Sequence, residues 1–343
     1  MKGRAATWNP QNRFEKLEYV RDEEAPPDDS SPRTIYMRDP TRTIIATNDS
    51  PDIGFEASVN PYRGCEHGCI YCFARPTHEY LGMSAGLDFE TRILVKEDAP
   101  VLLREELNAK KWQPKVLAIS GVTDPYQPIE RKLGITRGCL AVLADLRNPV
   151  AVITKNHLVT RDADLLAELA EHNAARVFIS ITTLDHSLQR TMEPRTSTPD
   201  LRLDAIATLA AAGVPVGVMV APVIPALTDH EMPAILAAAK KAGARWAGYV
   251  ALRLPWAVAP LFEQWLTEHF PDRKDKVLNR VRELREGKLY DAKWGVRGRG
   301  TGVFADQMEA LFDVTCRKLG LNEEDRKLST AAFRRRSAQA SLF

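Results

Sequence analysis

The sequence predicts an α/β protein built on a parallel sheet. Short runs of β-branched and other apolar residues alternate with longer segments of helical period, and this order repeats through most of residues 51–255. The composition, 44% hydrophobic and 27% charged over 343 residues, is that of a globular protein. The length suits one large domain with extensions, or two ordinary domains.

The chain divides into four segments by composition and period. Residues 1–50 form a partly irregular N-terminal extension with a short strand at 42–46, and residues 51–255 form the core. Strands are expected at 56–60, 92–95, 116–120, 150–154, 176–181 and 214–220, with a seventh at 246–251. Helices are expected between them at 99–110, 131–146, 162–172, 199–212 and 229–242. Asp162 and Asp229 occupy expected N-cap positions, and Gly213 and Gly243 stand where helices should end.

Residues 256–330 form a helical C-terminal region, with helices expected near 259–269 and 273–286. Its segment 294–302 is rich in glycine and arginine, and either binds phosphate or forms a tight loop that closes the core. Residues 331–343 form a basic tail.

Three of the five cysteines, Cys65, Cys69 and Cys72, lie in one short loop with the spacing C-x3-C-x2-C. Three thiolates at this spacing can hold a 4Fe–4S cluster and leave one iron without a protein ligand. The alternative is a structural zinc site with His67 as fourth ligand, although a second cysteine pair is missing. The other two, Cys139 and Cys316, are expected to pack in the core, or to serve as hydrogen donors if either reaches the site.

Polar side chains follow several of the expected strands. Thr123 and Asp124 come after one strand, Lys155 after the next, and Asp185 after a third. Parallel strands direct their carboxyl ends to the same edge, so these groups are expected to form the mouth of a site. Alternatively, Thr123 and Asp124 cap a turn.

The run Asn60-Pro-Tyr-Arg-Gly-Cys-Glu-His-Gly-Cys-Ile-Tyr-Cys-Phe73 resembles the motif of the radical S-adenosylmethionine (SAM) superfamily, and more closely its spore photoproduct lyase-like branch. The resemblance implies a partial (β/α)6 TIM-like barrel with the motif after its first strand, which periodicity alone does not decide. It also implies a 4Fe–4S cluster on Cys65, Cys69 and Cys72. SAM bound to that cluster is cleaved to a 5′-deoxyadenosyl radical with an electron from a reducing donor.

The resemblance also assigns single residues. Tyr71 is expected to line the site, and Thr123 and Lys155 to contact the amino-acid end of SAM, while the segment 193–195 borders it. The chain departs from the lyase at two positions. Gly121 stands where the lyase has a hydrogen-donating cysteine, and Phe73 where it has a tyrosine. A true spore photoproduct lyase is therefore not expected.

Partners and location follow from weaker signals. No apolar run is long enough for a membrane span and no signal peptide is evident, so a cytoplasmic protein is expected. The ending with Gln339, Leu342 and Phe343 resembles the peptide that docks bacterial repair proteins on the sliding clamp, or it packs on its own domain. DNA is the expected partner. Two kinds of charged cluster are present. Residues 22–30 are acidic, and we expect them to form solvated surface. The basic residues near the end form solvated surface or contact nucleic acid; they are Arg297, Arg299, Arg334, Arg335 and Arg336.

Two alternatives to a radical enzyme acting on nucleic acid stay open. One is the same chemistry on a protein or small molecule. The other is a zinc-stabilised nucleic-acid-binding protein without catalysis.

Overall fold

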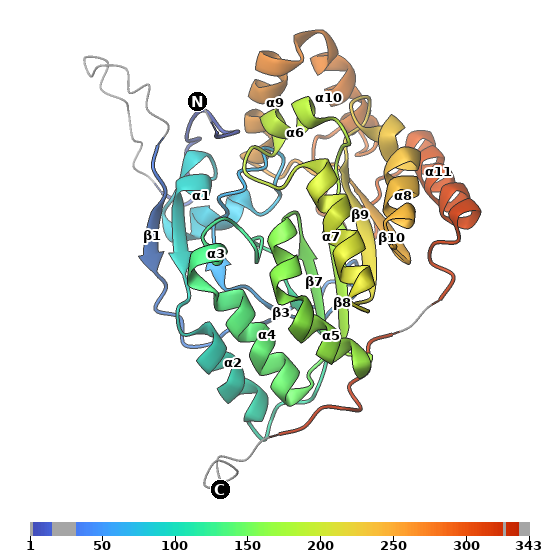
Figure 1. The fold of residues 1–343 in the computed structure, drawn as a ribbon. Helices are drawn as coiled ribbons and strands as arrows, with labels where there is room; N and C mark the ends of the chain where they lie inside the picture. Colours follow the sequence, from blue (N-terminus) through green and yellow to red (C-terminus); the bar gives the residue numbers. More distant parts are fainter. Residues whose placement is uncertain (1–2, 16–31, 325–326, 336–343) are drawn as a thin grey trace, which may run out of the picture.

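The computed structural model describes residues 3–15, 32–324 and 327–335, and its core is a seven-stranded open sheet in the order β10-β9-β8-β7-β6-β3-β2 (Figure 1). Neighbouring strands from β3 to β10 pair in parallel, while β2 pairs antiparallel with β3 at one edge. The strands are β2 (Ile45–Thr47), β3 (Ala57–Val59), β6 (Leu117–Ile119), β7 (Val150–Thr154), β8 (Ala175–Ser180), β9 (Val216–Val223) and β10 (Trp246–Ala251). The predicted parallel α/β fold is confirmed, with the parallel strands in sequential order as a partial barrel requires.

The predicted place of the strand at 92–95 is wrong. This strand, β5 (Arg92–Val95), pairs with β1 (Ile35–Arg38) and β4 (Tyr62–Arg63) in a separate small sheet. A short apolar run indicates a strand but not its partner, and its parallel partner β1 belongs to the extension, where no strand at 35–38 was expected. Lys155 therefore follows the third barrel strand, and Thr123 the second.

Helices cover the outer face of the sheet (Figure 1). They are α2 (Ala99–Asn108), α4 (Ile135–Leu146), α5 (Ala163–Glu171), α7 (Pro199–Ala211) and α8 (Met232–Lys241). Gly213 and Gly243 follow the last two with positive φ of 78° and 110°, a conformation that glycine adopts without a Cβ penalty. Asp162 stands at the predicted cap of α5, but its carboxylate instead accepts from Tyr126 and from two arginines.

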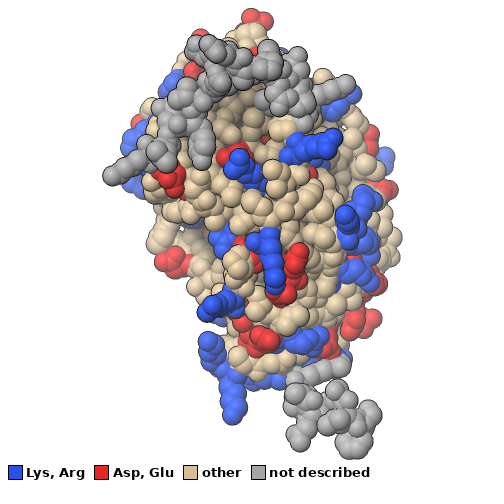
Figure 2. Space-filling model, turned by 90° about the vertical axis from the view of Figure 1, so that its left-hand side faces the viewer, with Lys and Arg blue, Asp and Glu red and all other residues tan. Residues whose placement is uncertain are grey.

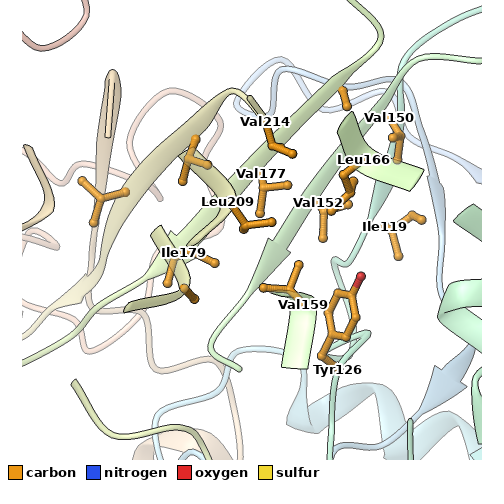
Figure 3. Close-up of a cluster of buried hydrophobic side chains, with 14 of the residues drawn as sticks. Ile119, Tyr126, Val150, Val152, Val159, Leu166, Val177, Ile179, Leu209 and Val214 are labelled. Carbon is orange, nitrogen blue, oxygen red and sulfur yellow. The ribbon is translucent and has the colours of Figure 1, made fainter. Parts of the chain in front are cut away.

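Alternate residues of the central strands pack against these helices. Figure 3 shows Val150 and Val152 of β7 and Val177 of β8 beside Leu166 and Leu209 of the covering helices. All five are fully buried, and each such side chain contributes about 1.5–3 kcal/mol through burial. The intervening residues, which face the other side of the sheet, are only half-buried, as at 151, 153, 176 and 178. The inner side of the barrel is thus less filled than the outer side.

The C-terminal region contains the two predicted helices, α9 (Val258–His269) and α10 (Lys274–Glu283), and a further one, α11 (Val303–Leu319), that packs against α8. Shorter helices occur in the connections. They are α1 (Leu87–Thr91), α3 (Glu130–Leu133), α6 (His186–Met192) and 3₁₀ turns at Arg75–Leu81, His157–Asp162, Asp229–Glu231 and Pro271–Arg273.

The glycine- and arginine-rich segment 294–302 links the two edges of the open sheet. The carbonyl of Gly298 accepts a hydrogen bond of 2.9 Å from Ala251 N at the end of β10. Asp52, in the turn between β2 and β3, accepts from Gly295 N at 2.6 Å and pairs with Arg297 at 2.5 Å. The structure therefore supports the tight-loop interpretation of this segment.

Residues 327–335 run along the end of the barrel where the strands begin. Ser329 N donates to the carbonyl of Asn173, and Arg334 and Arg335 donate to backbone carbonyls of Asp145 and Trp112. The predicted clamp peptide, with Gln339, Leu342 and Phe343, lies outside the described residues, as do Arg336 and the acidic stretch 22–30. In the part of the chain that the structure describes, no helix has the length and apolarity of a membrane span.

Candidate radical SAM site

The three motif cysteines lie in the loop that follows β3 and β4, at the carboxyl end of the first barrel strand. All three thiols are free, with Cys65 and Cys69 buried and Cys72 half-buried. Burial raises the pKa of the Cys65 and Cys69 thiols well above the usual range, and the neighbouring thiol of Cys72 adds to the rise for both. Cys72 packs against the hydrophobic cluster that contains Cys65 and against the one that contains Cys69, so the three thiols lie in one region, as ligands of one cluster must.

The backbone of this loop needs glycine at two positions. Gly64 and Gly68 have positive φ of 78° and 65°. A Cβ on Gly68 would also lie 2.7 Å from the Glu90 carboxylate, so no larger residue fits there without displacing Glu90. The loop is therefore packed closely against the residues beneath it.

Arg75 lies beneath the loop and is fully buried. Its guanidinium donates to the carbonyls of Gly68 and Cys69 at 2.9 Å each, and to those of Ala85 and Gly86. It also pairs with the buried Glu90 carboxylate at 2.5 Å. This arginine fixes the turn that carries Cys69, and motif spacing gave no indication of it.

His67 is occupied by other partners. Its Nδ1 lies 3.4 Å from Asp124, and its Nε2 lies 3.1 Å from the Asn156 amide. The pKa of Asp124 lies below its usual range: burial alone would raise it, but the His67 ring and hydrogen bonds from Thr154 and Lys155 N outweigh this. Among the described residues, no three Cys, His, Asp or Glu side chains, the three motif cysteines included, are arranged to hold a single metal ion. The zinc alternative therefore lacks support from His67.

Lys155 lies at the carboxyl end of β7 with its side chain 15% exposed. Its Nζ donates to the carbonyl of Ala221 at 2.8 Å, lies 3.5 Å from Glu193, and sits 5.7 Å from the ring centre of Tyr71. Burial lowers its pKa to about 8. The Lys155 charge acts on Cys69, where it lowers the thiol pKa against the larger effect of burial. The structure thus brings the predicted Lys155 and Tyr71 to the cysteine loop.

Glu193 connects Tyr71 to the rest of the site. It accepts from the Tyr71 hydroxyl, from Thr182 at 2.8 Å, and from the fully buried Arg202. Burial raises the pKa of Glu193, an effect that Arg202 opposes. The predicted border segment 193–195 does adjoin the loop, because Arg195 N reaches the carbonyl of His67 at 3.4 Å. Sequence reasoning missed Thr182 and Arg202, since a buried partner on another element leaves no local pattern.

Thr123 contacts the cysteine loop directly. Its hydroxyl donates to the carbonyl of Gly64 at 2.6 Å and accepts from Gln127 at 3.1 Å. Gln127 also accepts from the backbone N–H of Glu66. These bonds hold the strand end against the loop, and the expected contact of Thr123 with SAM stays a prediction.

Four other positions were singled out from the sequence, namely Phe73, Gly121, Cys139 and Cys316. Gly121 faces Asn60 without close contact, and Phe73 is 49% exposed beside Arg253. Cys139 and Cys316 both belong to the main hydrophobic core, whereas Cys69 belongs to a separate cluster that includes Tyr71. Cys139 and Cys316 are therefore packing residues in this fold.

His78, also beneath the loop, is expected to make the stability of the protein depend on pH. Its ring is buried and its Nε2 lies 2.9 Å from the carbonyl of Arg92. Burial lowers its pKa from 6.5 to about 4, so the unfolded chain binds a proton in a range where the folded protein does not. This contribution to stability is complete above about pH 6.5 and is lost as the pH falls toward 4.

We therefore expect wild type to lose about 2 kcal/mol more unfolding free energy between pH 7 and pH 5 than His78→Phe. Urea unfolding at the two pH values measures the difference. Equal pH dependence in both proteins would contradict the neutral, buried state of His78.

The fold and the cysteine loop together define a radical SAM domain, and comparison with known proteins agrees. The chain belongs to the Radical SAM superfamily, whose family model matches residues 59–239. It is 39% identical over 232 residues to the uncharacterized protein Rv2578c of Mycobacterium tuberculosis, a match that covers 67% of each chain. The uncharacterized protein MJ0683 of Methanocaldococcus jannaschii is 30% identical over 178 residues, 52% of this chain and 64% of that protein.

Among solved structures, the fold is similar to that of spore photoproduct lyase. The lyase complexed with dinucleoside spore photoproduct superposes with a TM-score of 0.56 at 16% identity, covering 83% of this chain and 80% of that one. A mutant lyase with bound AdoMet and dinucleoside spore photoproduct gives a TM-score of 0.53 at 17% identity, with the same coverage. The family resemblance is thus confirmed, and the likeness to the lyase holds at the level of the fold.

Proposed function

We propose that this protein is a radical SAM enzyme that holds a 4Fe–4S cluster on Cys65, Cys69 and Cys72. The observation that carries the proposal is the set of three free thiols in one loop at the end of the first barrel strand, where Cys72 packs against the clusters that contain Cys65 and Cys69, without a fourth protein ligand in His67. Three thiols suit a cluster with one open iron. When bound, the cluster supplies the electron that cleaves SAM to a 5′-deoxyadenosyl radical.

The chain's own residues bind and orient the cosubstrate in this proposal. Lys155 supplies a cation beside Cys69, at a depth where a carboxylate partner is little screened by water. Tyr71 and Glu193 lie beside Lys155, and the Glu193 carboxylate is already paired with Arg202. Lys155 therefore remains the group best suited to receive the SAM carboxylate. A reducing compartment, the cytoplasm, belongs to the proposal because oxidation would remove the thiolates.

The substrate class is proposed to be nucleic acid. A solved structure of similar fold is a lyase complexed with a dinucleoside photoproduct, which supports this choice. Where that lyase has a cysteine and a tyrosine, this chain has Gly121 and Phe73, and neither residue can donate a hydrogen atom in the same way. We therefore propose a reaction that differs from photoproduct repair. The same chemistry on a protein or small molecule remains the alternative, and it predicts no affinity for nucleic acid.

The test is anaerobic reconstitution, reduction with dithionite, and an assay for 5′-deoxyadenosine in the presence of SAM. We expect wild type to form the product and Lys155→Met to bind SAM about tenfold more weakly, since a charge-assisted hydrogen bond is lost. Lys115→Met is the matched control, because Lys115 pairs with an exposed carboxylate, Glu56, where the strands begin. A wild-type protein that holds zinc and forms no product would overturn the proposal.

A further inference from the structure

Exposed aromatic rings and arginines gather beside the cysteine loop. The rings of Phe73, Tyr80 and Trp256 are 49%, 72% and 52% exposed. Together with Arg13 and Arg253 they are here called the mouth surface. Large exposed rings at one place mark a binding surface rather than ordinary solvent exposure.

Rings and guanidinium groups alternate across the mouth surface. Arg253 lies over the ring of Phe73 at 4.8 Å, and Arg13 lies over that of Trp256 at 4.1 Å. Arg13 also lies 5.0 Å from the ring of Phe14, which stacks on Tyr80 with centroids 4.9 Å apart. Each of the three rings therefore has one face in contact with an arginine or with Phe14, and its exposed remainder can stack with a base, as on surfaces that bind single-stranded nucleic acid.

The mouth surface borders the proposed cluster site. Phe73 follows Cys72 directly, and Arg253 comes two residues after the end of β10. The segment around Arg253 is anchored by Leu252 and Leu254, which pack in the same cluster as Cys69, with Cys72 against it. A chain bound on these rings would thus lie next to the cysteine loop.

Arg13 and Arg253 differ in whether their side chains already have a partner within the chain. Arg13 is paired with the buried Glu79 at 2.7 Å. The Nε of Arg253 is buried and has no hydrogen-bond partner among the described residues, and the neighbouring carboxylate of Asp52 is already paired with Arg297. The Arg253 side chain is half-buried, and an anion bound beside it would satisfy this donor.

The backbone of Trp256 adopts an unfavourable conformation. Its φ is 44°, a left-handed conformation that is rare for a bulky residue. The strain does not serve core packing, because the ring stays exposed and contacts Arg13 and Tyr290 at the surface. Such strain is typical of residues that hold a ligand.

We propose that the mouth surface binds single-stranded nucleic acid, with bases stacked on Phe73, Tyr80 and Trp256 and a phosphate at Arg253. The net charge is only +2, and on the face seen in Figure 2 basic and acidic side chains are interspersed. The proposal therefore depends on stacking at the exposed rings rather than on a broad basic groove. The inference deepens the proposed function, on which it rests for the substrate class, and it does not require SAM cleavage.

The experiment is fluorescence anisotropy of the full-length protein with a labelled single-stranded DNA of mixed sequence. We expect Trp256→Ala to weaken binding about tenfold, and Trp256→Phe, which keeps a ring, to stay within about twofold of wild type. Arg253→Gln should lower the slope of log K against log salt by about 0.7, the value for one phosphate of a single strand.

The control is Arg335→Gln, which removes an exposed arginine that lies 5.7 Å from the Phe333 ring at the opposite end of the barrel. We expect this variant to bind as wild type does. Equal weakening by Arg335→Gln would show binding through general charge and overturn the proposal. Tighter binding of the duplex or of an acidic peptide, or no binding of the single strand, would also overturn it, whether or not 5′-deoxyadenosine is formed.

Discussion

Cys69→Ala is expected to lose its iron on reconstitution and to form no 5′-deoxyadenosine. The reason is the ligand count: three thiols lie together in the loop, and two do not hold a 4Fe–4S cluster. The carbonyl of Cys69 is bound by Arg75 through the backbone, which the substitution leaves in place. Iron and sulfide content per chain, with the product assay, measures the effect.

The matched control is Cys139→Ala, a buried cysteine in the main core on α4. Removing its sulfur costs about 1 kcal/mol through a small cavity and should leave iron content and product unchanged. Iron retained in Cys69→Ala together with activity would place the cluster elsewhere.

Arg75→Met is expected to cost about 3–5 kcal/mol of unfolding free energy, because it leaves the buried Glu90 carboxylate without its charged partner and with only the N–H of Ala6 as a donor among the described residues. It also removes the donors that hold the carbonyls of Gly68 and Cys69. Both side chains of the Arg75–Glu90 pair are 0% exposed, so water cannot replace the lost contacts. Urea unfolding of the apoprotein measures this change, and the iron content after reconstitution should fall with it.

Two variants separate this effect from a general loss of charge. Arg92→Met breaks a pair with Asp88 at 3.3 Å in which Arg92 is half exposed, and should cost about 0.5 kcal/mol. Adding Glu90→Met to Arg75→Met should recover part of the loss, because no unpaired charge then remains buried. A loss in Arg75→Met no larger than in Arg92→Met would show that the buried pair does not support the loop.

Local patterns account for what the sequence predicted correctly. The six parallel strands and their helices follow from runs of suitable period, and the cysteine loop from residues contiguous in the chain. Lys155 was expected near the cysteine loop from the end of a parallel strand and from the family resemblance, and its contact with SAM stays a prediction. The misplacement of β5 has the same origin, since its run of apolar residues reads like that of a barrel strand.

The parallel α/β class and the family could be predicted from the chain alone, because the strand and helix periods and the cysteine motif are formed by residues that are neighbours or regularly spaced. Other features depend on tertiary packing: the pairing of β5 with β1, the buried ion pairs Arg75–Glu90 and Glu193–Arg202, and the contacts of the segment 294–302 with both edges of the open sheet. The contact of Arg13 with Trp256 depends on packing as well. These contacts join residues that are far apart in the sequence. They could not be predicted, because the periodicity of a segment shows which of its faces is buried but not which distant side chain packs there.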